Sequence, residues 1–223
     1  MCWFIIIINI IYKVSLDLKD NTYETNVDII PSSQEINNIN LSDRYVLRKL
    51  LSSLDKDYDF CIIDCPPHLS KLTICAMIAG DYIIVPSLAD TDSLGGYDLL
   101  ISAVNDIRRS DNSNLSILGV LFCNVEKTKA LDTHIINSSI ENMRDNVFKT
   151  TISRASVVSQ ARFFGKPLVY YKPRSKPAQD YIEFTKEGAK KLEDVTNKYV
   201  KVETSSAETK EDSEQGENTE IST

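Results

Sequence analysis

One aspartate stands where carboxylates do chemistry in open α/β sheets. Asp64 follows the apolar run Phe60–Ile63 and precedes Cys65 and the prolines Pro66 and Pro67. Such a short apolar run suits a strand buried on both faces in the centre of a sheet, and the prolines make the chain leave the sheet directly afterwards. Ligands bind at the carboxyl ends of such strands. A carboxylate there can hold Mg²⁺ beside a nucleoside triphosphate; alternatively, it caps the next helix or turn.

A second group of residues able to do chemistry is basic. Between Asn146 and Gln179 the chain has seven lysines and arginines, no acidic residue, and aromatic residues interleaved among the bases. Unopposed positive charge is typical of a surface that contacts phosphates; the alternative is a solvated face. We expect the aromatic residues to belong to the core instead of stacking on bases. These residues are Phe163, Phe164, Tyr170 and Tyr171.

The composition is that of a soluble globular protein whose negative charge lies mainly at one end. Of 223 residues, 42% are hydrophobic and 26% are charged, and the net charge is −7. Residues 203–223 hold seven acidic residues and one lysine, a net −6, so the rest of the chain carries −1. This composition predicts a disordered acidic tail over residues 203–223.

The five cysteines and two histidines suggest neither a disulfide framework nor a metal site. The cysteine number is odd, no pair has the Cys-x-x-Cys spacing, and three cysteines lie in apolar segments, where a thiol behaves as a small hydrophobic group. This usage favours a reducing cytoplasm. His68 and His134 are too scattered for a metal site.

The elements that must position Asp64 alternate between strands and helices. We expect a strand in the isoleucine-rich residues 1–12, which are too short to span a membrane and lack the features of a signal peptide; a non-native start is the alternative. Residues 13–26 are expected to be irregular and residues 27–31 to form a short strand. Further strands are expected at 60–64, 82–86 and 115–125, and helices at 42–54, 70–79, 94–109 and 131–143. This alternation predicts βαβ units and a mostly parallel sheet.

A last amphipathic helix is expected from Ala178 to about Val200. Its predicted inner face comprises Tyr181, Ile182, Thr185, Ala189, Leu192, Val195 and Tyr199. The chain thus divides into an atypical segment over residues 1–26, one α/β domain over residues 27–202, and the acidic tail over residues 203–223.

Seven short motifs, in this order and spacing, resemble the ParA/Soj family of DNA-partitioning ATPases, relatives of MinD with a deviant Walker A motif. The resemblance runs from about Val27 to Val195 and implies a doubly wound α/β domain of the P-loop NTPase type. The motifs are Tyr58–Pro67, Gly80–Pro86, Ser93–Gly96, Ile117–Leu121, Val147–Thr150, Gly165–Leu168 and Tyr170–Tyr181.

The N-terminal P-loop unit of that family is missing here. Its glycine-rich loop cradles phosphates with backbone amides and lysines, but in this chain no glycine precedes Gly80. ATPase activity therefore stays open. Without the strand that leads into this loop, the sheet has a gap, and we hypothesise that Ile5 to Ile11 fill it.

The resemblance also implies roles for single residues. Asp64 corresponds to the Walker B carboxylate, a catalytic and nucleotide-binding residue that holds Mg²⁺. Asn124 stands where the family often has an asparagine that reads the adenine edge, although an asparagine in a turn is the alternative. Ser153 replaces the proline of the family's Ile-Pro-Arg segment, which helps to wall the base pocket. Non-specific DNA binding would fall to Arg154, Arg162, Lys172, Arg174 and Lys176.

The function implied by the resemblance is ATP-dependent segregation of a plasmid or chromosome. Implied cofactors are ATP and Mg²⁺. Implied partners are non-specific DNA, a ParB-like protein, and a second copy or a full-length ParA relative, with no membrane. The expected location is the cytoplasm, on the nucleoid. The alternative is a catalytically inactive, truncated remnant that modulates DNA or a partner protein.

Overall fold

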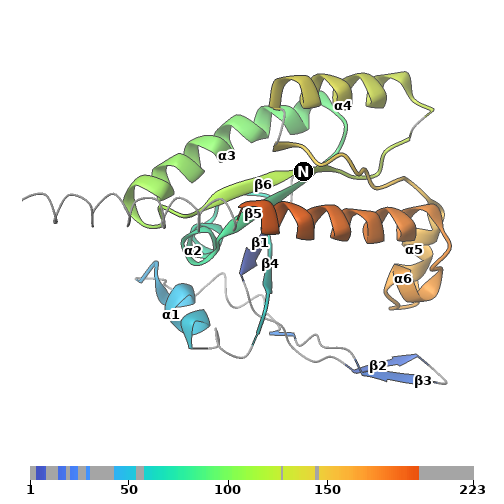
Figure 1. The fold of residues 1–223 in the computed structure, drawn as a ribbon, viewed down its shortest axis with the longest axis horizontal. Coiled ribbons are helices and arrows are strands. Elements are labelled where there is room, and N and C mark those ends of the chain that lie inside the picture. Colours follow the sequence, from blue (N-terminus) through green and yellow to red (C-terminus); the bar gives the residue numbers. More distant parts are fainter. Residues whose placement is uncertain are drawn as a thin grey trace, which may run out of the picture.

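The computed structural model describes residues 4–8, 15–18, 21–24, 29–30, 43–53, 58–126, 128–143 and 146–195. These residues build a sheet with helices on both faces (Figure 1). The acidic tail predicted over residues 203–223 lies outside the described residues. No helix in the described part of the chain is long and apolar enough to cross a membrane.

The sheet has four strands in the order β4-β1-β5-β6. The strands are β1 (Phe4–Ile8), β4 (Cys61–Cys65), β5 (Tyr82–Ser87) and β6 (Ser116–Phe122). β5 and β6 pair in parallel, whereas β1 is antiparallel to both of its neighbours. β4, β5 and β6 therefore run in the same direction, and their carboxyl ends lie at the same end of the sheet. The predicted α/β fold is confirmed, with one reversed strand that makes the sheet mixed.

β1 fills the gap that we expected to be filled by N-terminal isoleucines. Ile5 pairs with Asp64 on one side and with Ile84 on the other, so Phe4–Ile8 lies between β4 and β5. Residues 9–11, also included in that hypothesis, lie outside the described residues. Because β1 is reversed, its first residues, not its last, lie beside the carboxyl ends of β4 and β5. Its last residue, Ile8, pairs with Cys61 at the start of β4, away from Asp64.

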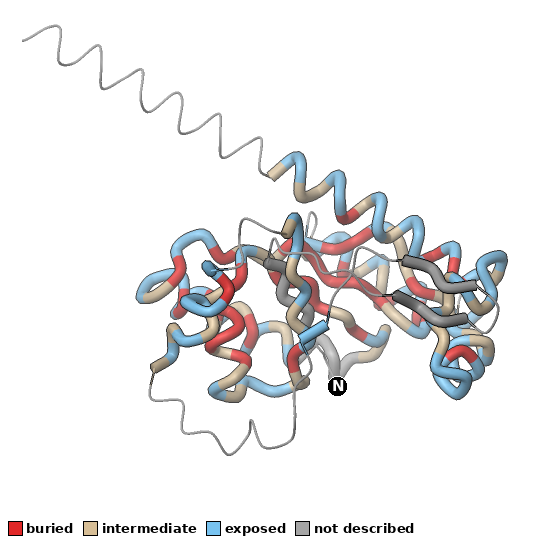
Figure 2. Tube along the Cα trace, turned by 90° about the horizontal axis from the view of Figure 1, so that it is seen from below, coloured by how far each residue is buried: buried red, intermediate tan, exposed pale blue. Residues whose placement is uncertain are grey.

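Helices cover the two faces of β5 and β6 through separate clusters. On one face, α2 (Lys71–Ala79) and α3 (Thr91–Ser110) bury Met77 and Leu100 against Ile83 and Phe122. On the other face, Ile84 and its neighbours pack beneath a helix over residues 176–195. Figure 2 shows the buried residues concentrated in the strands and in the inner faces of the helices. Helices on both faces are the arrangement of a doubly wound fold.

The remaining elements are short, and several differ from the sequence expectation. A hairpin of β2 (Ser15–Leu18) and β3 (Asn21–Glu24) occupies part of the segment expected to be irregular. Ile29 and Ile30, expected in a strand, have no regular structure and are 70% and 57% exposed. The basic stretch forms two short helices that were not predicted. The helices not yet named are α1 (Val46–Ser52), α4 (Ala130–Met143), α5 (Ser156–Phe163) and α6 (Leu168–Tyr171).

The inner face of the helix over residues 176–195 differs from the prediction. Tyr181 and Ile182 were expected to face inward, yet they are 40% and 37% exposed, and Thr185 and Ala189 are exposed too. Of the predicted residues, Leu192 and Val195 are half-buried, and Tyr199 lies outside the described residues. The other inward-facing residues are Asp180, Phe184, Glu187, Gly188 and Lys191. This face is largely polar because its side chains bond to backbone groups of the loop beneath it.

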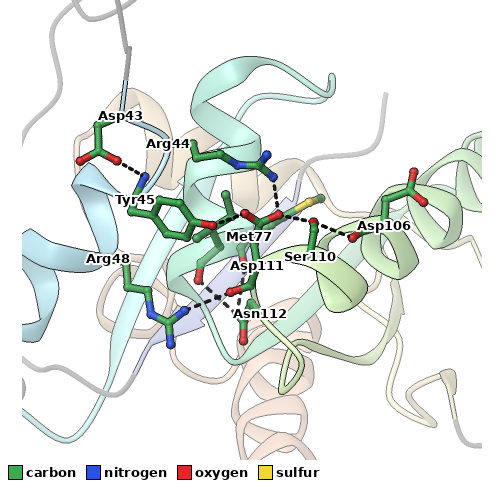
Figure 3. Close-up of polar contacts among 10 residues, drawn as sticks. Asp43, Arg44, Tyr45, Arg48, Met77, Asp106, Ser110, Asp111 and Asn112 are labelled. Atoms are coloured by element: carbon green, nitrogen blue, oxygen red, sulfur yellow. Dashed lines mark hydrogen bonds and ion pairs between the residues drawn. The ribbon is translucent and has the colours of Figure 1, made fainter.

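A polar cluster lies near the amino-terminal ends of β5 and β6, at the opposite end of these strands from their carboxyl ends (Figure 3). The Asp111 carboxylate accepts hydrogen bonds from Tyr45 Oη, at 2.5 Å, and from Arg44. Asn112 donates from Nδ2 to the Gly80 carbonyl at 2.7 Å and to two further carbonyls at the end of α2. The cluster joins the start of α1, the end of α2 and the end of α3. Since it lies where β5 and β6 begin, its role is structural.

Candidate functional site

A pocket opens at the carboxyl end of β6. Its volume is about 510 Å³, within the ordinary range of small-molecule sites. The strand end supplies Cys123 and Asn124, and the helix over residues 176–195 supplies Tyr181. The remaining lining residues come from the loop before α5 and from its first turns: Ile152, Ser153, Arg154, Ala155, Ser156, Val158 and Ser159. The structure thus brings together Asn124 and the Ile152–Arg154 segment, as the resemblance implies.

Asn124 adopts a left-handed backbone conformation and also lines the pocket. Its φ of 59° lies in the left-handed region, which asparagine tolerates better than most residues. Its side chain is exposed at the pocket and has no hydrogen bond to another described residue. The two interpretations of this residue, a turn former and a reader of a base, are therefore compatible.

Ser153 is held in the pocket wall by its backbone. The segment extends the sheet: Val125 donates from N to the Ile152 carbonyl, and Arg154 donates from N to the Val125 carbonyl, both at 3.0 Å. Between these bonds, Ser153 N donates to Asp180 Oδ2 at 2.9 Å. A proline at position 153 would lack this N–H, so the serine found here allows a bond that the family's usual residue cannot make.

Asp180 connects the pocket wall to one of the predicted DNA-binding residues. The carboxylate is only 2% exposed and also accepts a hydrogen bond from Lys176 Nζ. Burial alone would raise the pKa of Asp180, but the bonds from Lys176 and Ser153 outweigh it and hold the pKa below its ordinary value. Asp180 therefore stays ionised and keeps Ser153 in place.

Further along the helix over residues 176–195, two side chains contact residues 148–150, the part of the loop that precedes Ser153. Glu187 accepts hydrogen bonds from Lys149 N at 2.7 Å and from Thr150 N at 2.9 Å. Burial raises the pKa of Glu187, but these backbone bonds reverse the effect and the pKa is lowered. Lys191 lies 4.5 Å from the Phe148 ring centroid, as a cation over an aromatic ring. Together with Asp180, these side chains clamp residues 148–153 to the helix.

Asp64 lies apart from this pocket. It is exposed near the end of β4, three strand spacings from β6 in the sheet order, which corresponds to about 14 Å. The expectation of a central strand buried on both faces is wrong: β4 is an edge strand of the described sheet, and Ile62 is 69% exposed. An apolar run has the same pattern whether or not a neighbouring element covers it.

A magnesium ion would not find enough ligands around Asp64. Mg²⁺ takes about six oxygen ligands in octahedral geometry, several of them from water, substrate phosphate and loop hydroxyls. The described residues contain no cluster of three or more His, Cys, Asp or Glu side chains able to hold a metal. These residues do not fit a Mg–triphosphate site, and the catalytic role of Asp64 stays a prediction.

The cysteines near the site are poor nucleophiles. Burial, with a smaller contribution from the Asp64 charge, raises the pKa of Cys65 to about 12. Burial also raises the pKa of Cys123, in the pocket wall, to about 11. Both thiols are therefore protonated at neutral pH and act as small apolar groups.

The predicted DNA-binding residues divide into free and engaged cations. Arg162, Lys172 and Arg174 are exposed and have no ion pair with any described residue. Arg154 pairs with the Glu126 carboxylate, and Lys176 pairs with Asp180. We use the term basic surface for Arg162, Lys166, Lys172 and Arg174, which lie on or beside α5 and α6.

The aromatic residues of this stretch do not belong to the core, contrary to expectation. Phe163 is 85% exposed, Phe164 is 56% exposed and Tyr170 is 46% exposed, whereas Tyr171 is half-buried. Interleaving of basic and aromatic residues was visible in the sequence, but its pattern does not show which rings face solvent.

Comparisons with known proteins agree with the fold. A family model described as an AAA domain matches residues 6–117. The sporulation initiation inhibitor protein Soj of Bacillus subtilis is 34% identical over 180 residues, which cover 78% of this chain and 71% of Soj. The chromosome partitioning protein ParA of Caulobacter vibrioides is 28% identical over 180 residues, which cover 77% of this chain and 67% of ParA.

A solved structure supports the same fold. The septum site-determining protein MinD from Pyrococcus horikoshii, complexed with Mg-ADP, superposes with a TM-score of 0.57 at 24% identity. The match covers 81% of this chain and 70% of that protein. Because Soj is 34% identical over most of both chains, and the AAA-domain model matches half of this chain, this chain belongs to the ParA/Soj family of partitioning ATPases.

Proposed function

We propose that this chain acts in plasmid or chromosome partitioning as a protein that binds DNA without sequence preference through the basic surface. The proposal is carried by three exposed cations, in a stretch that has no acidic residue, that form no ion pair with a described residue: Arg162, Lys172 and Arg174. Contacts to phosphates give affinity but carry no sequence information. Such binding would place the protein on the nucleoid in the cytoplasm.

The pocket beside β6 suits the base of an adenine nucleotide. The Asn124 amide can both donate and accept, as the edge of adenine requires, and Tyr181 offers an aromatic side. The related MinD structure contains Mg-ADP. The described residues offer no comparable place for the triphosphate, since no glycine precedes Gly80 in the sequence and β1 is reversed.

A second candidate follows from this reversed strand: the chain is a catalytically inactive modulator. It would bind DNA, a ParB-like protein, a second copy or a full-length ParA relative, and it would not hydrolyse ATP by itself. In this function the basic surface binds DNA equally well with and without ATP. The two candidates differ in one measurable property, the dependence of DNA binding on Mg-ATP.

The experiment is equilibrium binding of the full chain to fluorescein-labelled duplexes of two unrelated sequences, followed by anisotropy over a range of salt, with and without Mg-ATP. We expect equal affinity for both sequences and a logarithmic salt slope of about −0.9 for each phosphate contact. Lys172→Gln is expected to reduce the slope by about one contact. Lys190→Gln, which removes another exposed lysine, is the matched control.

Each result decides between the candidates. No binding at low salt, or affinity that does not change with salt, would contradict the proposed DNA binding. Affinity that is unchanged by Mg-ATP supports the modulator. A large gain in affinity with Mg-ATP, lost in Asp64→Ala, would show that a nucleotide switch operates and would overturn the second candidate.

A further inference from the structure

Three aromatic rings form a continuous cluster beside the basic surface. Phe163, at the end of α5, meets Phe164 edge to face, with ring centroids 5.3 Å apart and an interplanar angle of 85°. Phe164 in turn stacks on Tyr171 of α6, with centroids 5.6 Å apart and an angle of 27°. The rings thus bridge the two short helices. Because Phe163 is 85% exposed, it is the ring with the most surface free for a ligand.

The exposure of this cluster is costly for a folded protein. A buried phenylalanine is favoured over an exposed one, so contiguous exposed apolar groups mark interaction sites. The exposed large apolar residues described between positions 146 and 179 are Val158, Phe163, Phe164 and Tyr170, and three of these four are aromatic. The aliphatic residues of α6, Leu168 and Val169, are half-buried. The exposed apolar groups of this surface are therefore mainly rings, which can stack on bases.

The charges around the rings match a polyanion. Arg162 precedes Phe163 directly, Lys166 follows Phe164 by two positions, and Lys172 follows Tyr171. Arg162 and Lys172 are exposed and have no ion pair within the described part of the chain. Rings flanked by cations are the combination that binds single-stranded nucleic acid, since bases stack on the rings while phosphates contact the cations.

We propose that Phe163 and the neighbouring rings stack on unpaired bases, so that this surface prefers single-stranded DNA to duplex DNA. In a duplex, the faces of the bases are already stacked on one another, whereas a single strand can present them to the protein. This proposal rests on the proposed function, because the same cations would supply the phosphate contacts. Phe163 does not line the pocket: the pocket reaches along α5 to Ser159, and Phe163 lies four residues, about 6 Å, further along the helix.

The test compares a fluorescein-labelled 20-nucleotide oligo(dT) with a 20-base-pair duplex, titrated with the full chain at one salt concentration. The wild-type chain is expected to bind the single strand more tightly. Phe163→Ala is expected to weaken single-strand binding about tenfold and duplex binding much less. Phe163→Tyr, which keeps the ring, should retain the preference. Leu99→Ala removes an exposed apolar side chain of α3, away from the rings and the pocket, and is the control; circular dichroism checks that all variants fold.

The outcomes separate this inference from the proposed function. If neither DNA binds, both fail. If the duplex binds with a steep salt dependence but oligo(dT) binds no better, or if Phe163→Ala weakens both equally, DNA binding stands and the stacking proposal is overturned. Co-sedimentation with anionic phospholipid vesicles that is lost in Phe163→Ala, with oligo(dT) binding unchanged, would also overturn it.

Discussion

Asp180 is the residue that most directly ties the pocket to the rest of the molecule. Its carboxylate joins the Ser153 backbone to Lys176, so the pocket wall and the start of the last helix share one buried anion. A ligand phosphate that draws Lys176 away would remove one of the two partners of this anion. The position of Ser153 would then depend on whether Lys176 contacts a ligand phosphate.

Replacing Asp180 with asparagine should destabilise the fold. The amide is uncharged, so the ion pair with Lys176 is lost and the bond to Ser153 N is weakened within a buried site. We expect a loss of about 1–3 kcal/mol in the free energy of unfolding, measured by urea denaturation at pH 7. Glu183→Gln, at an exposed position in the same helix, is the control and should change little.

The lowered pKa of Asp180 also predicts how the difference in the free energy of unfolding between wild type and Asp180→Asn changes with pH. The folded-state pKa of Asp180 lies below its ordinary value of 3.8, so its stabilisation is present above about pH 4 and disappears as the pH falls through the folded pKa. The difference in the free energy of unfolding between wild type and Asp180→Asn should therefore stay constant above about pH 4 and shrink as the pH falls further. A difference that does not shrink at any pH down to acid unfolding would show that Asp180 does not act as an anion.

Sequence reasoning found only part of the site at this scale. Asn124 and the Ile152–Arg154 segment were placed by resemblance to known motifs, and the structure brings them to one pocket. Asp180 and Glu187 were missed because each bonds to backbone groups 27 to 38 positions earlier in the chain, and such bonds leave no periodic pattern. The spacing of Asp180, Phe184, Glu187 and Lys191 on one helical face was the available signal.

Among the elements, those with long apolar runs were predicted best. The strand starting at Tyr82 and the helices starting near Ser70 and Leu131 have the expected positions within a few residues. The reversed direction of β1 was not predictable from its sequence, because an apolar five-residue strand can pair with either polarity. The edge position of β4 escaped prediction because it depends on which element covers that strand, not on the strand itself.

β1 is the element on which the integrity of the sheet depends. Each of its inner residues pairs on both sides; Ile6, for example, lies opposite Ile63 and Ile83. Without β1, the facing edges of β4 and β5 would be unpaired and open to other chains. Deletion of residues 1–12 is therefore expected to lower the thermal unfolding midpoint and to increase association, measured by calorimetry and light scattering.

A point substitution tests the same element in the full chain. Ile6→Pro removes an N–H from a strand with two neighbours, where proline is strongly disfavoured, and should also lower the midpoint. Ile30→Pro, at an exposed residue outside regular structure, is the matched control. Unchanged unfolding after both the deletion and Ile6→Pro would mean that β1 does not support the sheet.

For the whole molecule, the distribution of charge matters more than its total. Residues 203–223 carry −6 of the net −7, while the basic stretch between positions 146 and 179 contains only positive charges. Opposite charges attract, so under the proposed DNA binding the acidic residues would compete with DNA for the same cations. Screening shortens this attraction from about 10 Å at 0.1 M salt to about 3 Å at 1 M.

Removal of residues 203–223 should therefore strengthen DNA binding at low salt. We expect the chain ending at residue 202 to bind a labelled duplex several-fold more tightly than the full chain at 50 mM salt, and the difference to vanish near 500 mM, in the anisotropy assay. Because deletion also shortens the chain, the control keeps all 223 residues and replaces the seven acidic residues of the tail by glutamine or asparagine; it should match the deletion. Equal affinity of all three proteins at low salt would show that the tail does not compete with DNA, and that the basic surface is available to DNA at all times.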